Sequence, residues 1–63
     1  MYLNLFIARK ENRKSQNDVA QYLNITKQTY CRKEKGTADF TITEGQKLAD
    51  YFGRSLDELF QKS

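Results

Sequence analysis

Hydrophobic residues recur along the chain at intervals of three and four positions, the spacing that places side chains on one face of a helix. Val19, Ala20 and Leu23 have this spacing in one segment, and Tyr30 and Glu34 lie one turn apart in the next. The alternation of apolar and polar positions that is typical of strands is hard to find, and the chain contains no proline. The pattern therefore predicts an all-α domain.

Helix start signals recur at four places. Ser15, Thr41 and Ser55 are each followed three residues later by an acidic residue, the spacing of a capping box. In such a box the hydroxyl accepts a hydrogen bond from the third helical amide, and the acid accepts one from the amide of the cap residue. Thr26 is a further candidate for an N-cap. Each of these positions predicts the beginning of a helix.

Helix stop signals lie between the start signals. Asn24, Gly36 and Gly53 can each take the left-handed conformation that ends a helix. The start and stop signals together predict five helices, near 2–12, 16–23, 27–35, 42–52 and 56–61.

The segment Ser15–Glu34 is predicted to be two helices joined by a short turn. Ala20 is small where two steeply crossing helices must approach, and Asn24 lies at the corner, where a left-handed residue is needed. The outward face of the second helix carries Lys27, Gln28, Cys31, Arg32 and Lys35. Long hydrogen-bond donors on one helix face suit the major groove of DNA. The segment thus indicates a helix-turn-helix; the alternative is an ordinary helical hairpin with a solvated basic face.

The length of the chain and the distribution of its charges narrow the range of possible functions. Sixty-three residues form one domain, 1–63, whose thin core leaves little room for an enclosed substrate pocket. Residues 1–36 carry eight Lys/Arg against three acidic residues, a net charge of +5, whereas residues 37–63 carry a net charge of −2. A basic half beside an acidic half is typical of a surface that binds a polyanion. A lysine-rich solvated surface without a partner is the alternative.

Several classes of function lack their signals in this sequence. The single Cys31 cannot form an internal disulfide, and no His/Cys cluster offers a metal site. Because no nucleophile–base set or phosphate loop is present, we expect no enzyme, no cofactor and no small-molecule ligand. No apolar run approaches the roughly 20 residues of a membrane span, and the N-terminus lacks a signal-peptide pattern. We therefore expect a cytoplasmic protein without a membrane partner.

Residues 15–30 and 34–36, flanked by 4–11 and 48–60, carry a family resemblance. They resemble the Cro/phage-repressor (xenobiotic-response-element) type of helix-turn-helix regulator, including its small stand-alone phage and mobile-element members. The resemblance implies a compact five-helix, lambda-repressor-like domain with the helix-turn-helix at its second and third helices. It also implies a transcriptional repressor or activator that binds a two-fold operator in double-stranded DNA as a homodimer, with RNA polymerase as a further partner. The alternative is an antitoxin-type interaction protein of a toxin–antitoxin pair.

The resemblance assigns expected roles to single residues. The positions that match base-contacting residues of the family are Thr26, Lys27, Gln28 and Arg32. The positions that match contacts to the DNA backbone are Ser15, Gln16, Lys35 and Gly36. Arg9 and Glu34 match a pair that forms a salt bridge between the first and third helices in many members.

Three positions depart from the family pattern. Lys33 stands where the family usually has an apolar residue, so we expect its stem to pack while its ammonium reaches solvent or phosphate. Lys14 replaces a common leucine and thins the core beside the first turn. Phe40 stands where many members have proline, and we expect its buried ring to anchor the loop. Within the motif itself, we expect Cys31 to be a small filler that contacts DNA or solvent.

Overall fold

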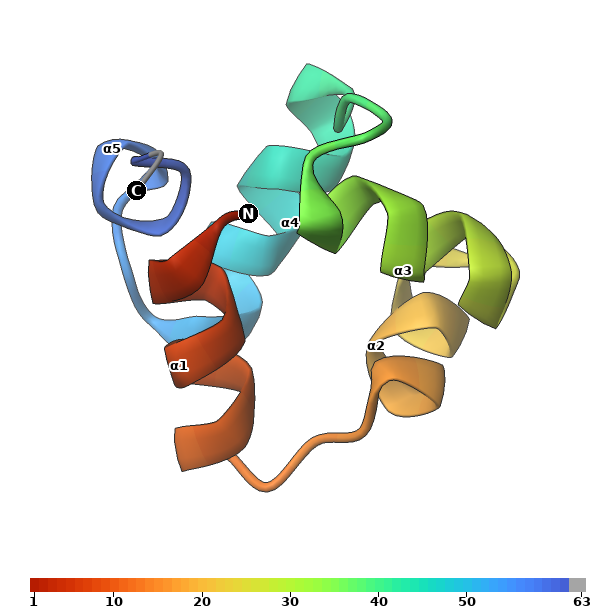
Figure 1. Ribbon diagram of the computed structural model, residues 1–63. Coiled ribbons are helices and arrows are strands. Elements are labelled where there is room, and N and C mark those ends of the chain that lie inside the picture. The colour runs from red at the N-terminus through yellow and green to blue at the C-terminus, as the bar shows by residue number, and fades with distance from the viewer. Residues whose placement is uncertain (62–63) are drawn as a thin grey trace.

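The computed structural model describes residues 1–61 and contains five α-helices and no strand among them (Figure 1). The helices are α1 (Leu3–Glu11), α2 (Gln16–Leu23), α3 (Lys27–Lys35), α4 (Ile42–Phe52) and α5 (Leu56–Leu59). The predicted all-α, five-helix fold is confirmed, although α1 and α5 are shorter than expected. Helix α5 ends at Leu59, one turn after it begins, whereas the sequence signals predict a helix to residue 61.

The helix caps follow the sequence signals at α2, α3 and α4. Ser15 and Thr41 both form complete capping boxes, and the Thr26 hydroxyl accepts from the backbone N–H of Thr29 at 3.1 Å. Asn24 has a φ of 62° and ends α2 in the left-handed conformation, as predicted. The turn before α2 contains a second left-handed residue that sequence reasoning missed, Arg13 with a φ of 56°.

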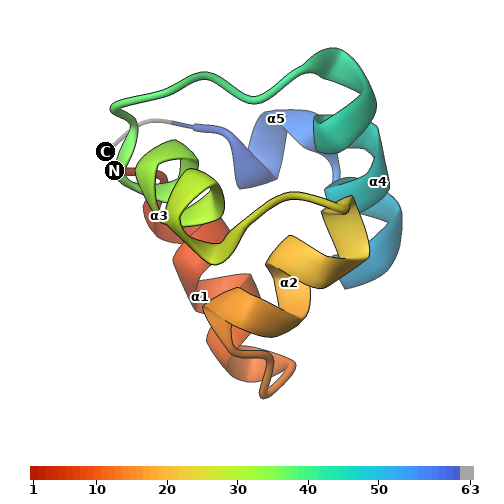
Figure 2. The same cartoon turned by 90° about the vertical axis from the view of Figure 1, so that its right-hand side faces the viewer.

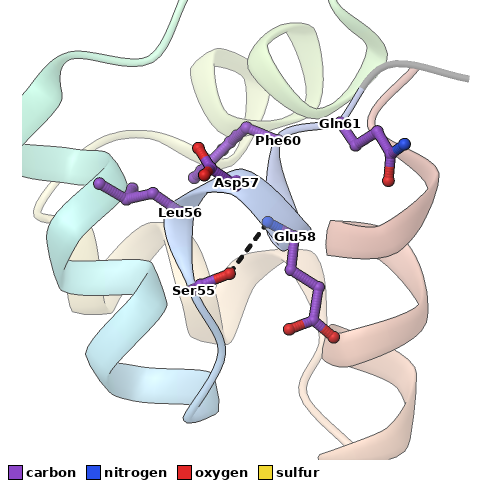
Figure 3. A pocket seen from close by; sticks show the side chains of 6 residues that line it. All are labelled: Ser55, Leu56, Asp57, Glu58, Phe60 and Gln61. Atoms are coloured by element: carbon purple, nitrogen blue, oxygen red, sulfur yellow. Dashed lines mark hydrogen bonds between the residues drawn. The ribbon is translucent and has the colours of Figure 1, made fainter.

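The predicted capping box at Ser55 is only half formed. Its hydroxyl accepts from the backbone N–H of Glu58 at 3.1 Å (Figure 3), but the Glu58 carboxylate bonds Arg54 at 2.9 Å. A charged guanidinium is a stronger donor than a backbone amide, so it takes the carboxylate away from the cap. The second half of this prediction was therefore wrong.

The core forms where the five helices meet. Helix α2 packs against α3, and α5 contacts both α1 and α4, as the two views show (Figures 1 and 2). The buried apolar residues are Tyr2, Leu5, Ala8, Val19, Ala20, Leu23, Tyr30, Leu48, Phe52 and Leu59. The predicted inner faces of the helix pair are thus buried, and this burial fixes the position of α3 relative to α2.

The loop between α3 and α4 is anchored by aromatic packing. Phe40 is half-buried, with its ring centroid 5.9 Å from that of Tyr2, 6.1 Å from Tyr30 and 5.2 Å from Phe60. The expected structural role of Phe40 is confirmed by these contacts. This packing connects α3 to the N-terminal segment and to the residue that ends α5.

Lys33 does not behave as expected. Its stem is buried, but its Nζ pairs with Glu44 Oε1 at 2.6 Å, and the two side chains are only 12% and 14% exposed. The same Nζ lies 5.9 Å from the centre of the Phe40 ring. The prediction that the ammonium reaches solvent or phosphate was therefore wrong, because the carboxylate at the N-terminus of α4 captures it. Lys14 remains exposed, with its Nζ 5.8 Å from the Tyr51 ring centre.

Candidate nucleic-acid interface

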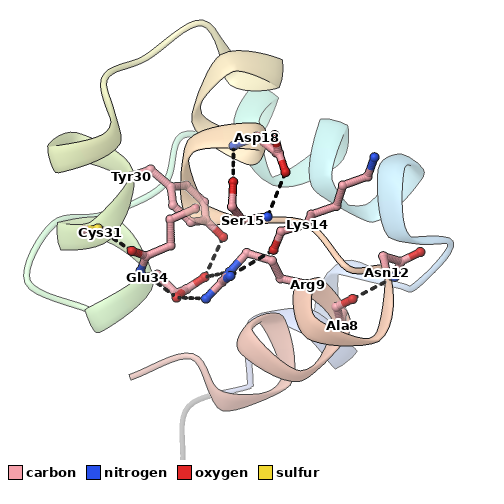
Figure 4. Close-up of polar contacts among 10 residues, drawn as sticks. Ala8, Arg9, Asn12, Lys14, Ser15, Asp18, Tyr30, Cys31 and Glu34 are labelled. Carbon is pink, nitrogen blue, oxygen red and sulfur yellow. Dashed lines mark hydrogen bonds and ion pairs between the residues drawn. The ribbon is translucent and has the colours of Figure 1, made fainter.

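A buried ion pair joins α1 to α3 (Figure 4). Arg9 Nε donates to Glu34 Oε2 at 2.9 Å, and Arg9 Nη2 donates to Glu34 Oε1 at 3.2 Å. The two side chains are 5% and 4% exposed. Two parallel hydrogen bonds of this kind set both distance and angle. The pair that the family resemblance implied is thus present, and it orients α3 relative to α1.

Two further donors complete the surroundings of the Glu34 carboxylate. The Tyr30 hydroxyl donates to Oε2 at 2.7 Å, and Gln16 Nε2 donates to Oε1 at 3.3 Å. Burial alone would raise the pKa of Glu34, but the hydrogen bonds from Arg9 and Tyr30 and the attraction of Arg9 outweigh it and lower this pKa. Burial and the bond to Glu34 raise the pKa of Tyr30. The carboxylate therefore stays charged beside a neutral phenol and a guanidinium.

The N-terminus of α2 opens into a shallow hollow. The residues that line this hollow are Arg9, Lys10, Ser15, Gln16, Asn17 and Lys27. Backbone N–H groups in the first turn of a helix have no partner within that helix, and the helix dipole makes this end attractive to anions. One carboxylate, Asp18, lies in the same turn; hydrogen bonds from Ser15 occupy it and lower its pKa. The hollow combines helix N–H donors with cationic side chains, which suits a phosphate.

Lys10 and Asn17 are members of this hollow that the sequence analysis did not single out. Asn17 directly follows the expected contact Gln16, and that adjacency was an available signal. Lys10 lies in the last turn of α1, and its place in the hollow depends on how the turn at residues 12–15 directs the start of α2.

The outer side of α3 is exposed. Lys27, Gln28 and Arg32 are exposed and line a second hollow together with the half-buried Cys31. Within residues 1–61, the side-chain hydrogen bonds and ion pairs of α3 are made by residues other than Lys27, Gln28 and Arg32. The donors of Lys27, Gln28 and Arg32 therefore remain available to an outside acceptor.

The other expected DNA contacts lie at the two ends of α3. Thr26 uses its hydroxyl as the N-cap and also donates it to Thr29 Oγ1 at 2.8 Å. Lys35 is exposed in the last turn, and Gly36 follows it with a φ of 91°. Cys31 differs from the expectation, because its thiol donates to Gln16 Oε1 at 2.9 Å rather than facing only DNA or solvent.

The opposite end of the molecule has different chemistry. A hollow beside α5 is lined by Ser55, Leu56, Asp57, Glu58, Phe60 and Gln61 (Figure 3). Its two carboxylates lie in the first turn of α5, where the helix dipole favours negative charge. Such a surface repels a polyanion. Within residues 1–61, no three His, Cys, Asp or Glu side chains come together as they would in a metal site.

In the part of the chain that the structure describes, every helix is too short or too polar to cross a lipid bilayer.

Comparison with known proteins identifies one match. A helix-turn-helix family model matches residues 5–59, which includes all of α2, α3 and α4 and nearly the whole chain. No curated protein and no solved structure matches significantly.

Proposed function

The chain belongs to the helix-turn-helix family of DNA-binding transcription regulators, and we propose that it recognises a specific operator through the outer side of α3. One observation carries this proposal. Lys27, Gln28 and Arg32 share an exposed surface and make no side-chain hydrogen bond within residues 1–61, while the opposite side of the same helix is locked by Glu34. A rigid helix with available donors suits direct readout in the major groove.

Different residues on the outer side of α3 recognise different bases in this proposal. Lys27 and Arg32 suit the O6 and N7 acceptors of guanine, and Gln28 suits the N6 and N7 atoms of adenine. Each good contact of this kind gives roughly 1–3 kcal/mol of discrimination. Thr26 completes the base-contacting set at the start of α3, where its methyl group is available even while its hydroxyl caps the helix.

Contacts to phosphate position the domain without reading sequence. We assign this role to Ser15 and Gln16 at the start of α2 and to Lys35 and Gly36 at the end of α3. Lys10 and Asn17 join them, because they line the same hollow as Ser15 and Gln16. The two groups lie at the two ends of the helix-turn-helix, so they would hold α3 between two stretches of the DNA backbone.

The regulator acts as a homodimer on a two-fold operator. A single small module buries only about 600–1,000 Å² of protein surface on DNA, which limits its specificity. Two copies on half-sites roughly 34–36 Å apart double the contacts and match the symmetry of a palindrome. Bound in this way, the protein represses by excluding RNA polymerase from a promoter or activates by contacting it.

Selection of bound sites from random double-stranded DNA tests this proposal. We expect enrichment of a palindrome whose half-site centres are about one helical turn apart. The matched control is a variant with Lys27, Gln28 and Arg32 all changed to alanine, which should fold normally and enrich no sequence. Enrichment of a single half-site would overturn the dimer. No enrichment by the natural protein would overturn specific recognition and leave an interaction module as the better interpretation.

A further inference from the structure

A thiol on α3 contacts the residue at the start of α2. Cys31 Sγ donates to Gln16 Oε1 at 2.9 Å, and Gln16 Nε2 donates to Glu34 Oε1 at 3.3 Å. Gln16 and Cys31 are both half-buried, and Figure 4 shows Cys31 one turn from Glu34 in the same polar network. The amide of Gln16 is thus held at both its oxygen and its nitrogen by side chains of α3.

The two hydrogen bonds fix the direction in which this amide is turned. A glutamine amide has one acceptor oxygen and a nitrogen with two N–H donors. If the amide turned over, its oxygen would face the charged carboxylate of Glu34, which can only accept. In the observed direction Glu34 takes one N–H, and the second N–H is left for an acceptor outside the protein.

We propose that Cys31 is a positioning residue for DNA binding, whose thiol holds the Gln16 amide with its nitrogen available to a phosphate oxygen. This inference rests on the proposed function, in which Gln16 contacts the DNA backbone. Cys31 then strengthens binding through Gln16, independently of base sequence. Its role differs from that of Arg32, which lies on the same helix and reads a base.

Substitutions at Cys31 separate this role from simple filling of space. Serine keeps a donor at this position, whereas alanine removes it. We expect Cys31→Ala to weaken binding to short random-sequence duplexes about two- to fivefold, since a thiol is a weak donor and one hydrogen bond has a modest net effect. Cys31→Ser should restore most of the affinity. Equal losses in the two variants would overturn the inference, because packing and not the donor would then matter.

A double-mutant cycle with Gln16→Ala tests whether Cys31 acts through Gln16. If it does, Cys31→Ala should have almost no further effect in a chain that already carries Gln16→Ala. Effects on binding that simply multiply would overturn the inference while leaving the phosphate role of Gln16 intact. Urea unfolding of the same four proteins serves as the control for stability, and the coupling in DNA affinity should exceed any coupling in unfolding free energy.

Two further outcomes separate this inference from the proposed function. If Gln16→Ala binds DNA as well as the natural protein does, the backbone contact assigned to Gln16 is absent and the positioning role fails with it. Operator selection by the natural protein would still test base reading by α3. If Cys31→Ala instead changes the selected sequence, Cys31 contacts a base directly and the positioning role is overturned.

Discussion

The two sides of α3 are built on opposite principles. On the inner side, Tyr30 and Glu34 are buried, and every oxygen of the Glu34 carboxylate accepts at least one hydrogen bond from Arg9, Tyr30 or Gln16. On the outer side, Lys27 and Arg32 are exposed and form no ion pair within residues 1–61. A buried charge needs hydrogen-bond or ion-pair partners within the protein, whereas an exposed cation is hydrated and can bind an anion outside the protein. The inner side therefore determines where α3 lies, and we propose that the outer side determines what it binds.

Removing the inner carboxylate should have the largest effect on the protein. Glu34→Ala leaves the Arg9 guanidinium buried without its partner, and breaking a buried pair in this way costs about 3–5 kcal/mol of unfolding free energy. That is a large share of the stability of so small a domain. Urea unfolding measures the loss.

The matched control for this prediction is Glu11→Ala, which removes a surface pair. Glu11 contacts Arg54 at 2.7 Å, with side chains that are 55% and 39% exposed. Exposed pairs of this kind contribute about 1 kcal/mol or less. Similar losses for the two variants would show that the inner network is no more important than a surface contact.

Removing an outer cation should affect binding and leave stability unchanged. Arg32→Ala is expected to lose about 1–3 kcal/mol of binding free energy for the selected operator and much less for scrambled DNA. Unfolding free energy should change by no more than about 0.5 kcal/mol, as for other surface positions. Lys47→Ala, on the exposed surface of α4, is the control that should alter neither quantity. An equal loss on both DNAs would assign Arg32 to phosphate instead of a base.

The link between α3 and α4 should be intermediate in effect. Glu44 Oε1 accepts from both Lys33 Nζ at 2.6 Å and the Thr41 backbone N–H at 3.0 Å. Glu44→Ala removes both bonds and is expected to cost about 1–2 kcal/mol of unfolding free energy. Lys33→Met should cost less, because an apolar stem remains beside Phe40 and Glu44 keeps its bond to Thr41. Thermal or urea unfolding of the two variants would contradict this order if the lysine change were the more damaging.

The smallest effect should be the contribution of Glu44 to the dependence of stability on pH, and this contribution changes in acid. Burial acts to raise the pKa of Glu44, but the bonds from Lys33 and Thr41 prevail and lower it from the ordinary value of 4.5. As the pH falls below 4.5, the unfolded chain takes up a proton that the folded protein does not, so unfolding free energy decreases until the lower folded pKa is passed. Unfolding measured over a pH series should therefore show a shallower acid loss in Glu44→Gln than in the natural protein. Parallel curves would mean that Glu44 titrates alike in both states.

Some of these features were visible in the sequence because they depend on neighbouring residues. The features found in this way are the N-caps and the left-handed end of α2, at Ser15, Thr26, Thr41 and Asn24. Each involves partners within a few positions, and each is formed by a residue type that favours that conformation. The all-α fold followed from the same local signals. The Arg9–Glu34 pair spans 25 positions and was expected only through the family resemblance.

The remaining contacts depend on how separate helices meet. Lys33 pairs with Glu44 and Cys31 with Gln16 only because the fold brings side chains of α4 and α2 within hydrogen-bond reach of α3. The sequence pattern gave no indication of these bonds, because a lysine or cysteine that faces solvent can occupy the same helical positions as Lys33 and Cys31. The hollow that contains Lys10 was hidden for the same reason, because residues of α1, α2 and α3 line it together.

The assignment of DNA binding to the helix-turn-helix, and not to the surface beside α5, can be tested most directly by NMR titration of the folded protein with a short duplex that contains the selected operator. We expect the largest changes in backbone amide shifts at residues 15–17 and 26–36, and small changes at Ser55–Gln61. Changes concentrated at Ser55–Gln61, with α3 unaffected, would contradict the account.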